Sequence, residues 1–205
     1  VVAIIDPGKK GLTSNDVIQI GGDIPVVGSF NDAKKYNPDH LVIGNAPQGG
    51  IVSNQMLIEI KEAIRNGINI VSGMHEFLSK DIHLKKLAEQ FGSKIIDLRM
   101  PPSPPSFSKG SWRKRNIPVL LVVGTDCDTG KMTTAWEIKT RLSDLNKKVK
   151  FIGTGQTGIL LSDGIAIDAV ISDFMSGEIE NLIDSKVAND TDLIIVEGQG
   201  ALSNY

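Results

Sequence analysis

The residues best suited to chemistry lie in the stretch "VVGTDCDTGKMTT", residues 122–134. Its glycines allow the backbone to turn N–H groups inward, and its lysine supplies a mobile positive charge. The helix expected after it presents the positive end of its dipole. An apolar strand, glycines, a lysine and a helix in this order predict a phosphate-binding loop. We expect its ligand to contact Gly124, Thr125, Asp126, Asp128, Thr129, Gly130, Lys131, Thr133 and Thr134.

The loop departs from the common pattern G-x-x-x-x-G-K-[ST] in two ways. Five residues rather than four separate Gly124 from Gly130, and Met132 follows the lysine where a magnesium-binding hydroxyl is usual. A thioether is a poor ligand for a hard cation such as Mg²⁺. Thr133 or Thr134 could replace the hydroxyl only in a shifted register, because a helical step of about 100° redirects the side chain. The methionine therefore favours a loop that holds phosphate without cleaving it.

Further polar residues follow expected strands, where open α/β sheets place their ligands. Glu197 could act as a general base or a metal ligand, or be a surface carboxylate. The segment "GTGQTG", residues 153–158, suits the wall of a substrate or cofactor site, or a plain turn. Asp173 and Glu178 lie near a helix start, where they could cap the helix or contact substrate. We predict Lys131 and Glu197 as catalytic residues, and as substrate-binding residues Gln156, Thr157, Asp173, Glu178 and Gln199.

Weaker candidates are Cys127, His75 and the glycine-rich segment 44–50. An acyl-cysteine at Cys127 is disfavoured because no partner histidine is nearby in sequence. Segment 44–50 is not G-x-G-x-x-G, so a substrate-site or domain-interface loop is favoured over dinucleotide binding. His75 could line a site, although a structural hydrogen bond is its more ordinary role. The histidines and the cysteine lack metal-ligand spacing, so we expect no structural zinc site and assign no metal ligand.

Short apolar runs alternate with helical patterns along the chain, which is typical of parallel βαβ units. The expected strands are 1–5, 39–44, 68–72, 94–98, "VLLVV", "VKFIG" and "DLIIVEGQG", and the expected helices are 54–66, 81–91, 131–146 and 176–187. Four prolines and the basic residues 113–115 interrupt the pattern and indicate a solvated linker over 99–117. We predict an α/β fold of two consecutive parallel-sheet domains, 1–98 and 118–205, the second truncated.

The composition is that of an ordinary globular protein, with 40% apolar and 22% charged residues. A net charge of −2 gives no reason to expect nucleic acid or a membrane as partner, and a small-molecule substrate is favoured. No apolar run approaches the roughly 20 residues that span a bilayer, and no signal peptide opens the chain. A single cysteine favours the reducing cytoplasm. Both ends look cut, so we expect a fragment, and a homo-oligomer stays open.

Several of these segments resemble known families. The loop "GTDCDTGKMTT" is similar to the G-T-D-x-x-x-G-K-T loop of dethiobiotin synthetase and its relatives, and "VEGQGAL" resembles their strand-end V-E-G-x-G. Nearly the whole chain resembles a two-domain family long catalogued as of unknown function, which includes D-glutamate N-acetyltransferases. The matching pieces are "VVAIID", "HLVIGNAPQGG", "GINIVSGMHEFLS", "IIDLRMPP", "GTDCDTGKMTTAWEI", "GTGQTGI", "SDFMSGEIE" and "VEGQGAL".

The resemblance implies a Rossmann-like N-terminal domain, a P-loop NTPase-like C-terminal domain, and a protein that continues beyond residue 205. It implies acetyl transfer from acetyl-CoA to the amino group of an acidic amino acid, D-glutamate. Coenzyme A carries a pyrophosphate and a 3′-phosphate that an acyltransferase never breaks, which agrees with Met132. For an anionic substrate we also expect a cationic anchor, either Arg99 or a linker arginine.

Two alternatives stay open. The first is a Mg·ATP-dependent ligase or kinase resembling dethiobiotin synthetase, in which Lys131, Thr133 and Glu197 would organise ATP and Mg²⁺. The second is a nucleotide- or CoA-binding module without turnover, since the sequence shows no obvious catalytic dyad.

Overall fold

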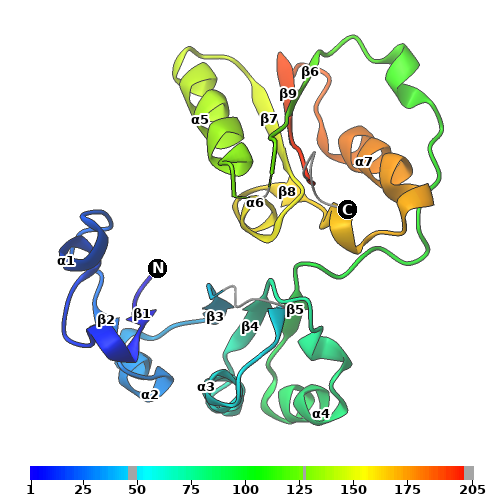
Figure 1. The fold of residues 1–205 in the computed structure, drawn as a ribbon. Helices are drawn as coiled ribbons and strands as arrows, with labels where there is room; N and C mark the ends of the chain where they lie inside the picture. The colour runs from blue at the N-terminus through cyan, green and yellow to red at the C-terminus, as the bar shows by residue number, and fades with distance from the viewer. Residues whose placement is uncertain (46–49, 127, 201–205) are drawn as a thin grey trace. The chain divides into compact units, whose positions relative to one another are not determined.

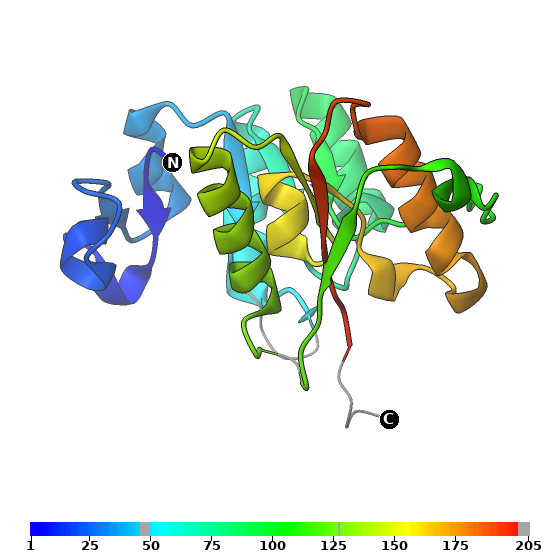
Figure 2. The ribbon, with the colours of Figure 1, turned by 90° about the horizontal axis from the view of Figure 1, so that it is seen from above.

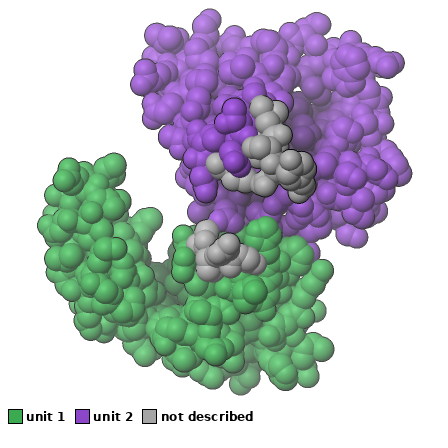
Figure 3. Space-filling view, in the orientation of Figure 1, with its two compact units in different colours: residues 1–97 green, residues 98–205 purple. Residues whose placement is uncertain are grey.

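The chain divides into two units, Val1–Asp97 and Leu98–Tyr205 (Figure 3). The computed structural model describes residues 1–45, 50–126 and 128–200. Cys127, residues 46–49 of the glycine-rich segment and residues 201–202 of "VEGQGAL" lie outside the described residues. Within the described residues, no helix has the length and apolar character that crossing a bilayer requires.

The first unit contains a three-stranded parallel sheet in the order β3-β4-β5 and a separate parallel pair, β1-β2 (Figure 1). Its strands are β1 (Ile4–Ile5), β2 (Val26–Val27), β3 (His40–Ile43), β4 (Asn69–Ser72) and β5 (Ile95–Asp97). Its helices are α1 (Ser14–Ile18), α2 (Phe30–Ala33), α3 (Asn54–Arg65) and α4 (Ile82–Phe91). The alternation of parallel strands and helices is as predicted.

Local signals in the sequence set the ends of the two longer helices of this unit. Ser53 caps α3 by accepting a hydrogen bond from the Met56 amide at 3.2 Å. Asp81 caps α4 in the same way, and Gly92 ends it in the left-handed conformation. The buried face of α3 carries Ile60 and Ile64 into the core of the unit.

The second unit contains a four-stranded parallel sheet in the order β6-β9-β7-β8. Its strands are β6 (Val119–Val122), β7 (Val149–Gly153), β8 (Asp163–Gly164) and β9 (Leu193–Glu197). Its helices are α5 (Lys131–Asp144), α6 (Gln156–Leu161) and α7 (Ser172–Lys186). Short 3₁₀ turns complete the two units, at Pro7–Lys9, Lys34–Tyr36, Leu78–Lys80, Ser111–Lys114 and Ile167–Ala169.

Helices α5 and α7 cover opposite faces of this sheet (Figures 1 and 2). Side chains alternate between the faces of a strand, so Ile195 of β9 packs with Ala135 of α5 while Ile194 packs with Ile183 of α7. Trp136 joins the α5 side and contacts Phe151 edge to face, with ring centroids 5.3 Å apart. Trp136 therefore packs against the core on this face of the sheet.

Two helices differ from the sequence prediction. The segment "GTGQTG" was expected to be a wall or a turn, but its second half begins α6 at Gln156. The glycines of this segment allow α6 to pack closely against the end of β7, since a Cβ on Gly158 would lie 2.9 Å from the Gly153 Cα. Helix α7 begins at Ser172 rather than near residue 176, and no side chain caps it in the described chain.

The proline-rich segment is attached to α7 by two buried glutamates. Glu178 accepts a hydrogen bond from the backbone amide of Ser106. Glu180 accepts from the amides of Lys109 and Ser111 and, at 2.9 Å, from the Ser108 hydroxyl. Residues 98–117 are therefore bound to the second unit along much of their length, which differs from a solvated linker.

Candidate functional site

The loop between β6 and α5 folds back on itself around the carbonyl oxygen of Asp126. That oxygen accepts hydrogen bonds from the Thr129 hydroxyl at 2.9 Å and from Lys131 Nζ at 2.6 Å. The turn needs a glycine at 124, because a Cβ there would collide with Thr129 Oγ1 and lie 2.9 Å from Lys131 Cγ. The sequence-predicted strand, loop and helix are therefore all present.

Helix α5 begins immediately after the loop with its first amides available to a ligand. Gly130 is the N-cap residue with φ of 84°, and no side chain of the described residues caps the helix there. The N–H groups at the first turn of a 14-residue helix, together with its dipole, favour an anion. Lys131, the first residue of α5, adds a positive charge beside them.

Glu197 ends β9, the strand next to β6. In the β6–β9 ladder it pairs with Val122, two residues before Gly124, so the carboxylate lies beside the loop. Its Oε2 accepts hydrogen bonds from the backbone amides of Thr154 at 2.9 Å and Gly155 at 3.2 Å. The side chain is only 7% exposed, so it is not the surface carboxylate that one sequence reading allowed.

One cavity of about 460 Å³ brings the loop and Glu197 together. The residues that line it are Asp128, Gly130, Lys131, Met132, Thr133, Glu197, Gln199 and Gly200. Met132 lines the cavity and also packs against the core residues Ala135 and Phe151. Lys131 and Glu197, the two predicted catalytic residues, thus face a shared space.

The charges around this cavity are mixed. Asp128 and Glu197 contribute carboxylates, and Lys131 contributes an ammonium group. An anionic ligand would therefore depend on the α5 amides as well as on Lys131, or on a cation that offsets the carboxylates. In the described chain, no group of three or more His, Cys, Asp or Glu side chains could hold a metal ion.

Three predicted substrate residues lie elsewhere in the second unit. Arg99 is buried and ion-paired with Asp168, so its guanidinium is not available as an anion anchor at this cavity. Glu178 binds the proline-rich segment, as described above. Asp173 is an exposed residue of the first turn of α7 rather than its cap. Arg115 is not a solvated charge either, because it pairs with Asp184 at 2.7 Å.

The remaining predicted residues belong to elements that contribute to the site, but they do not line the cavity. Gln156 and Thr157 form the first turn of α6, which starts beside the Glu197 carboxylate. Thr125, Asp126 and Thr129 form the loop, and Thr134 belongs to the first turn of α5, where its amide bonds to the Gly130 carbonyl at 2.9 Å.

Thr154 lies in the candidate segment "GTGQTG", but the sequence analysis did not single it out as a site residue. It is 1% exposed, and its amide and its hydroxyl both donate to Glu197. Its position directly after strand β7 was the available signal, because strand-end residues of a parallel sheet meet at one edge.

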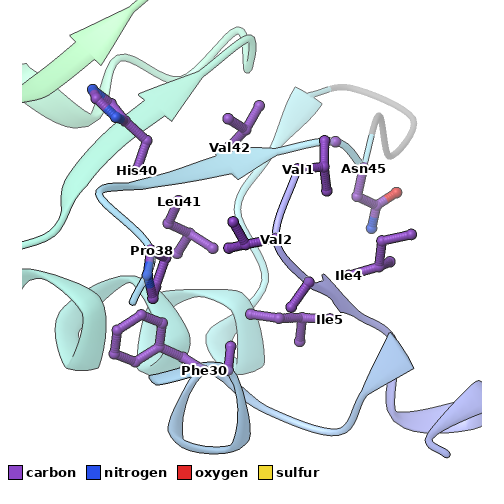
Figure 4. A pocket seen from close by; sticks show the side chains of 13 residues that line it. Val1, Val2, Ile4, Ile5, Phe30, Pro38, His40, Leu41, Val42 and Asn45 are labelled. Atoms are coloured by element: carbon purple, nitrogen blue, oxygen red, sulfur yellow. The ribbon is translucent and has the colours of Figure 1, made fainter. Parts of the chain in front are cut away.

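A second cavity, of about 480 Å³, lies in the first unit (Figure 4). Mostly apolar side chains line it, among them Ile5, Phe30 and Leu41, and His40 lies at its rim (Figure 4). No acidic residue, lysine or arginine appears among the described residues that line it. Among these lining residues, only His40 and Asn45 carry polar side chains.

Comparison with known proteins agrees with this division. Residues 7–101 match the family described as "Domain of unknown function (DUF1611_N) Rossmann-like domain", and residues 106–205 match "Domain of unknown function (DUF1611_C) P-loop domain". The chain belongs to the DUF1611 family. The Rossmann-like first domain and the P-loop second domain that the sequence predicted are confirmed.

Relatives of this DUF1611 chain carry a functional name. It is 42% identical over 177 residues to a D-glutamate N-acetyltransferase of Pseudoalteromonas sp., covering 86% of this chain and 52% of the relative. It is 38% identical over 175 residues to one of Tritonibacter scottomollicae, covering 85% and 51%. The chain therefore spans about half the length of the curated relatives it matches.

A solved structure also resembles this chain. The crystal structure of a DUF1611 family protein from Anabaena variabilis superposes with a TM-score of 0.90 at 35% sequence identity. The match covers 100% of this chain and 59% of that one.

Proposed function

We propose that this chain provides the cofactor site of an N-acetyltransferase, which moves an acetyl group from acetyl-CoA to the amino group of an acidic amino acid. The observation that carries the proposal is the cavity shared by Lys131 and Glu197. The two relatives named D-glutamate N-acetyltransferase supply the reaction class and D-glutamate as the acceptor.

The residues around the cavity fit the phosphates of coenzyme A. The uncapped first turn of α5 offers backbone N–H groups, and Lys131 and Thr133 add an ammonium group and a hydroxyl. Met132 packs on the apolar core where a magnesium-binding hydroxyl is usual. A phosphate group that is held but never transferred does not need that hydroxyl.

Bound acetyl-CoA would supply the acetyl thioester. The acceptor nitrogen attacks the carbonyl carbon, an N–C bond forms, and the C–S bond breaks as the thiolate of coenzyme A leaves. The nitrogen loses one proton, and the thiolate gains one on release. Glu197 is suited to accept the nitrogen's proton through Oε1, since its Oε2 is already bound by two amides. Gln199 offers a side-chain amide that can donate to an acceptor carboxylate.

One observation favours a second function, a Mg·ATP-dependent ligase or kinase. Asp128 and Glu197 both line the cavity, and Glu197 ends the strand adjacent to the loop strand. P-loop enzymes that transfer phosphoryl groups hold Mg²⁺ partly through a carboxylate from such a strand.

A thermal-shift panel on the full chain separates the two functions. Coenzyme A, acetyl-CoA, ATP and Mg·ATP are compared, since a ligand at 100 times its Kd stabilises the folded state by about 2.7 kcal/mol. The acetyltransferase proposal predicts stabilisation by coenzyme A and acetyl-CoA in the presence of EDTA. Stabilisation by Mg·ATP, with none by coenzyme A, would overturn it in favour of the second function.

A further inference from the structure

The backbone N–H and the hydroxyl of Thr154 are both bonded to the same residue. Its backbone N–H donates to Oε2 of Glu197 at 2.9 Å, and its hydroxyl donates to the backbone carbonyl of Glu197 at 2.8 Å. Thr154 therefore holds Glu197 at two points, the carboxylate and the main chain.

These bonds begin where the regular sheet ends. The paired residues of the β7–β9 ladder stop at Ile152 and Val196, two and one residues before Thr154 and Glu197. Without the threonine hydroxyl, no described side chain donates to the Glu197 carbonyl. The Thr154 hydroxyl thus continues the hydrogen bonding between β7 and β9 past the last paired residues. Its partner is Glu197, which lines the cavity.

The glycines around Glu197 leave its carboxylate little freedom. A Cβ on Gly158 would collide with Oε2, and a Cβ on Gly155 would lie 3.3 Å from Oε1. The carboxylate lies in a slot formed by the start of α6 and the end of β7. Two amide donors hold one oxygen in that slot.

We propose that Thr154 is a positioning residue for Glu197, which it aims at the acceptor nitrogen through the paired bonds to its carboxylate and its carbonyl. This inference rests on the proposed function, in which Glu197 takes a proton from the acceptor. Thr154 itself is 1% exposed and does not line the cavity, so it acts only through Glu197.

The test uses the full chain with Thr154→Val, which keeps the shape and removes the hydroxyl, and Thr154→Ser, which keeps the hydroxyl. We expect Thr154→Val to lower kcat by roughly tenfold to a hundredfold, because small displacements of a catalytic group are costly. The Kd for coenzyme A should stay within about twofold, and the pH profile of kcat should change shape. Thr154→Ser should restore kcat to within about threefold of wild type.

A double mutant identifies the route of the effect. If Thr154 acts through Glu197, the double mutant Thr154→Val/Glu197→Gln should have a kcat within about twofold of that of Glu197→Gln alone, since the two changes remove one function. The matched control is Ser93→Ala in the first unit, where a buried hydroxyl donates to the Ile64 carbonyl at 3.0 Å. That variant should keep the wild-type kcat.

Three results overturn the inference. The first is a folded Thr154→Val protein with wild-type kcat and pH profile, and the second is a full additional loss in the Glu197→Gln background. If Thr154→Val does not fold, Thr154→Cys takes its place, and wild-type kinetics there have the same meaning. The third is a wild-type protein that transfers no acetyl group, which removes the proposed function as well and so is distinguished from the other two.

Discussion

Lys131 and Glu197 line one cavity from different elements, as the first residue of α5 and the last residue of β9. The order of the strands explains why Lys131 and Glu197 lie at the same cavity. Strand β9 lies directly beside β6, the strand that leads into the loop, and Glu197 pairs with Val122 of β6. The cavity therefore combines a cationic helix start with a buried carboxylate. Phosphate binding and proton transfer can be tested separately through these two residues.

Replacing Lys131 by alanine should weaken the binding of coenzyme A. A charged hydrogen bond is worth about 1.5–3 kcal/mol, so the Kd should rise by roughly tenfold to a hundredfold. Isothermal titration on the full chain measures the change. The control is Lys147→Ala, an exposed lysine beyond the other end of α5, which should leave the Kd unchanged. Equal Kd values for Lys131→Ala and wild type would place the phosphates elsewhere.

Glu197→Gln should separate chemistry from binding. A glutamine side chain can still accept hydrogen bonds from the backbone amides of Thr154 and Gly155, but it is a far weaker base. We expect kcat to fall by about 10²- to 10⁴-fold, the usual contribution of general base catalysis, with the Kd for coenzyme A unchanged. Glu89→Gln, at an exposed residue of α4, is the control. A variant that keeps wild-type kcat would exclude Glu197 as the base.

Gly158→Ala tests the slot that holds the carboxylate. The added methyl group would collide with Glu197 Oε2 and approach the Gly153 Cα to 2.9 Å. We expect a loss of about 1–3 kcal/mol in the free energy of unfolding and a fall of roughly tenfold or more in kcat. Gly44→Ala is the matched control, since a Cβ there would have none of the described residues within 4 Å. An alanine at 158 without effect on either quantity would contradict the packing described for α6.

The attachment of the proline-rich segment should depend on pH. Hydrogen bonds from the backbone amide of Lys109 and from the serines at 108 and 111 lower the pKa of Glu180 from 4.5 to about 2. A carboxyl group with a lowered folded-state pKa stabilises the fold above its unfolded pKa, and this contribution is lost as the pH falls through the folded value. Glu180→Gln should therefore be less stable than wild type at pH 7.

Denaturant midpoints at several pH values measure this difference. The gap between wild type and Glu180→Gln should be constant above about pH 5, shrink below 4.5 and close near pH 2. Glu137→Gln, at a glutamate whose side chain is 58% exposed and pairs with Arg141, should show no such gap. A gap independent of pH would mean that the ionised form of Glu180 does not hold the segment.

The loop and its neighbouring strands were predictable because their signals are local. An apolar run, paired glycines and a lysine before a helix specify the turn whatever the rest of the chain does. The position of Glu197 near the loop could be inferred from its place at the end of a strand, since ligands of open α/β sheets bind at the carboxyl ends of the parallel strands.

Long-range contacts explain what the sequence did not reveal. Helix α6 was hidden because Gly155 and Gly158 read as turn residues, although Gly158 is needed for contact with β7 and Glu197. The contacts of Arg99 and Glu178 were hidden for a similar reason. Their partners, Asp168 and the Ser106 amide, are about 70 residues away, where no local pattern indicates them.

The proposed function requires the cavity beside Lys131 and Glu197 to bind acetyl-CoA for transfer of its acetyl group. The most direct measurement follows the free thiol of coenzyme A released by the full chain, with D-glutamate as acceptor and EDTA present. We expect thiol release that requires both substrates and equals the N-acetylglutamate formed. No thiol release, with magnesium-dependent formation of ADP from ATP when the same acceptor is added, would contradict it.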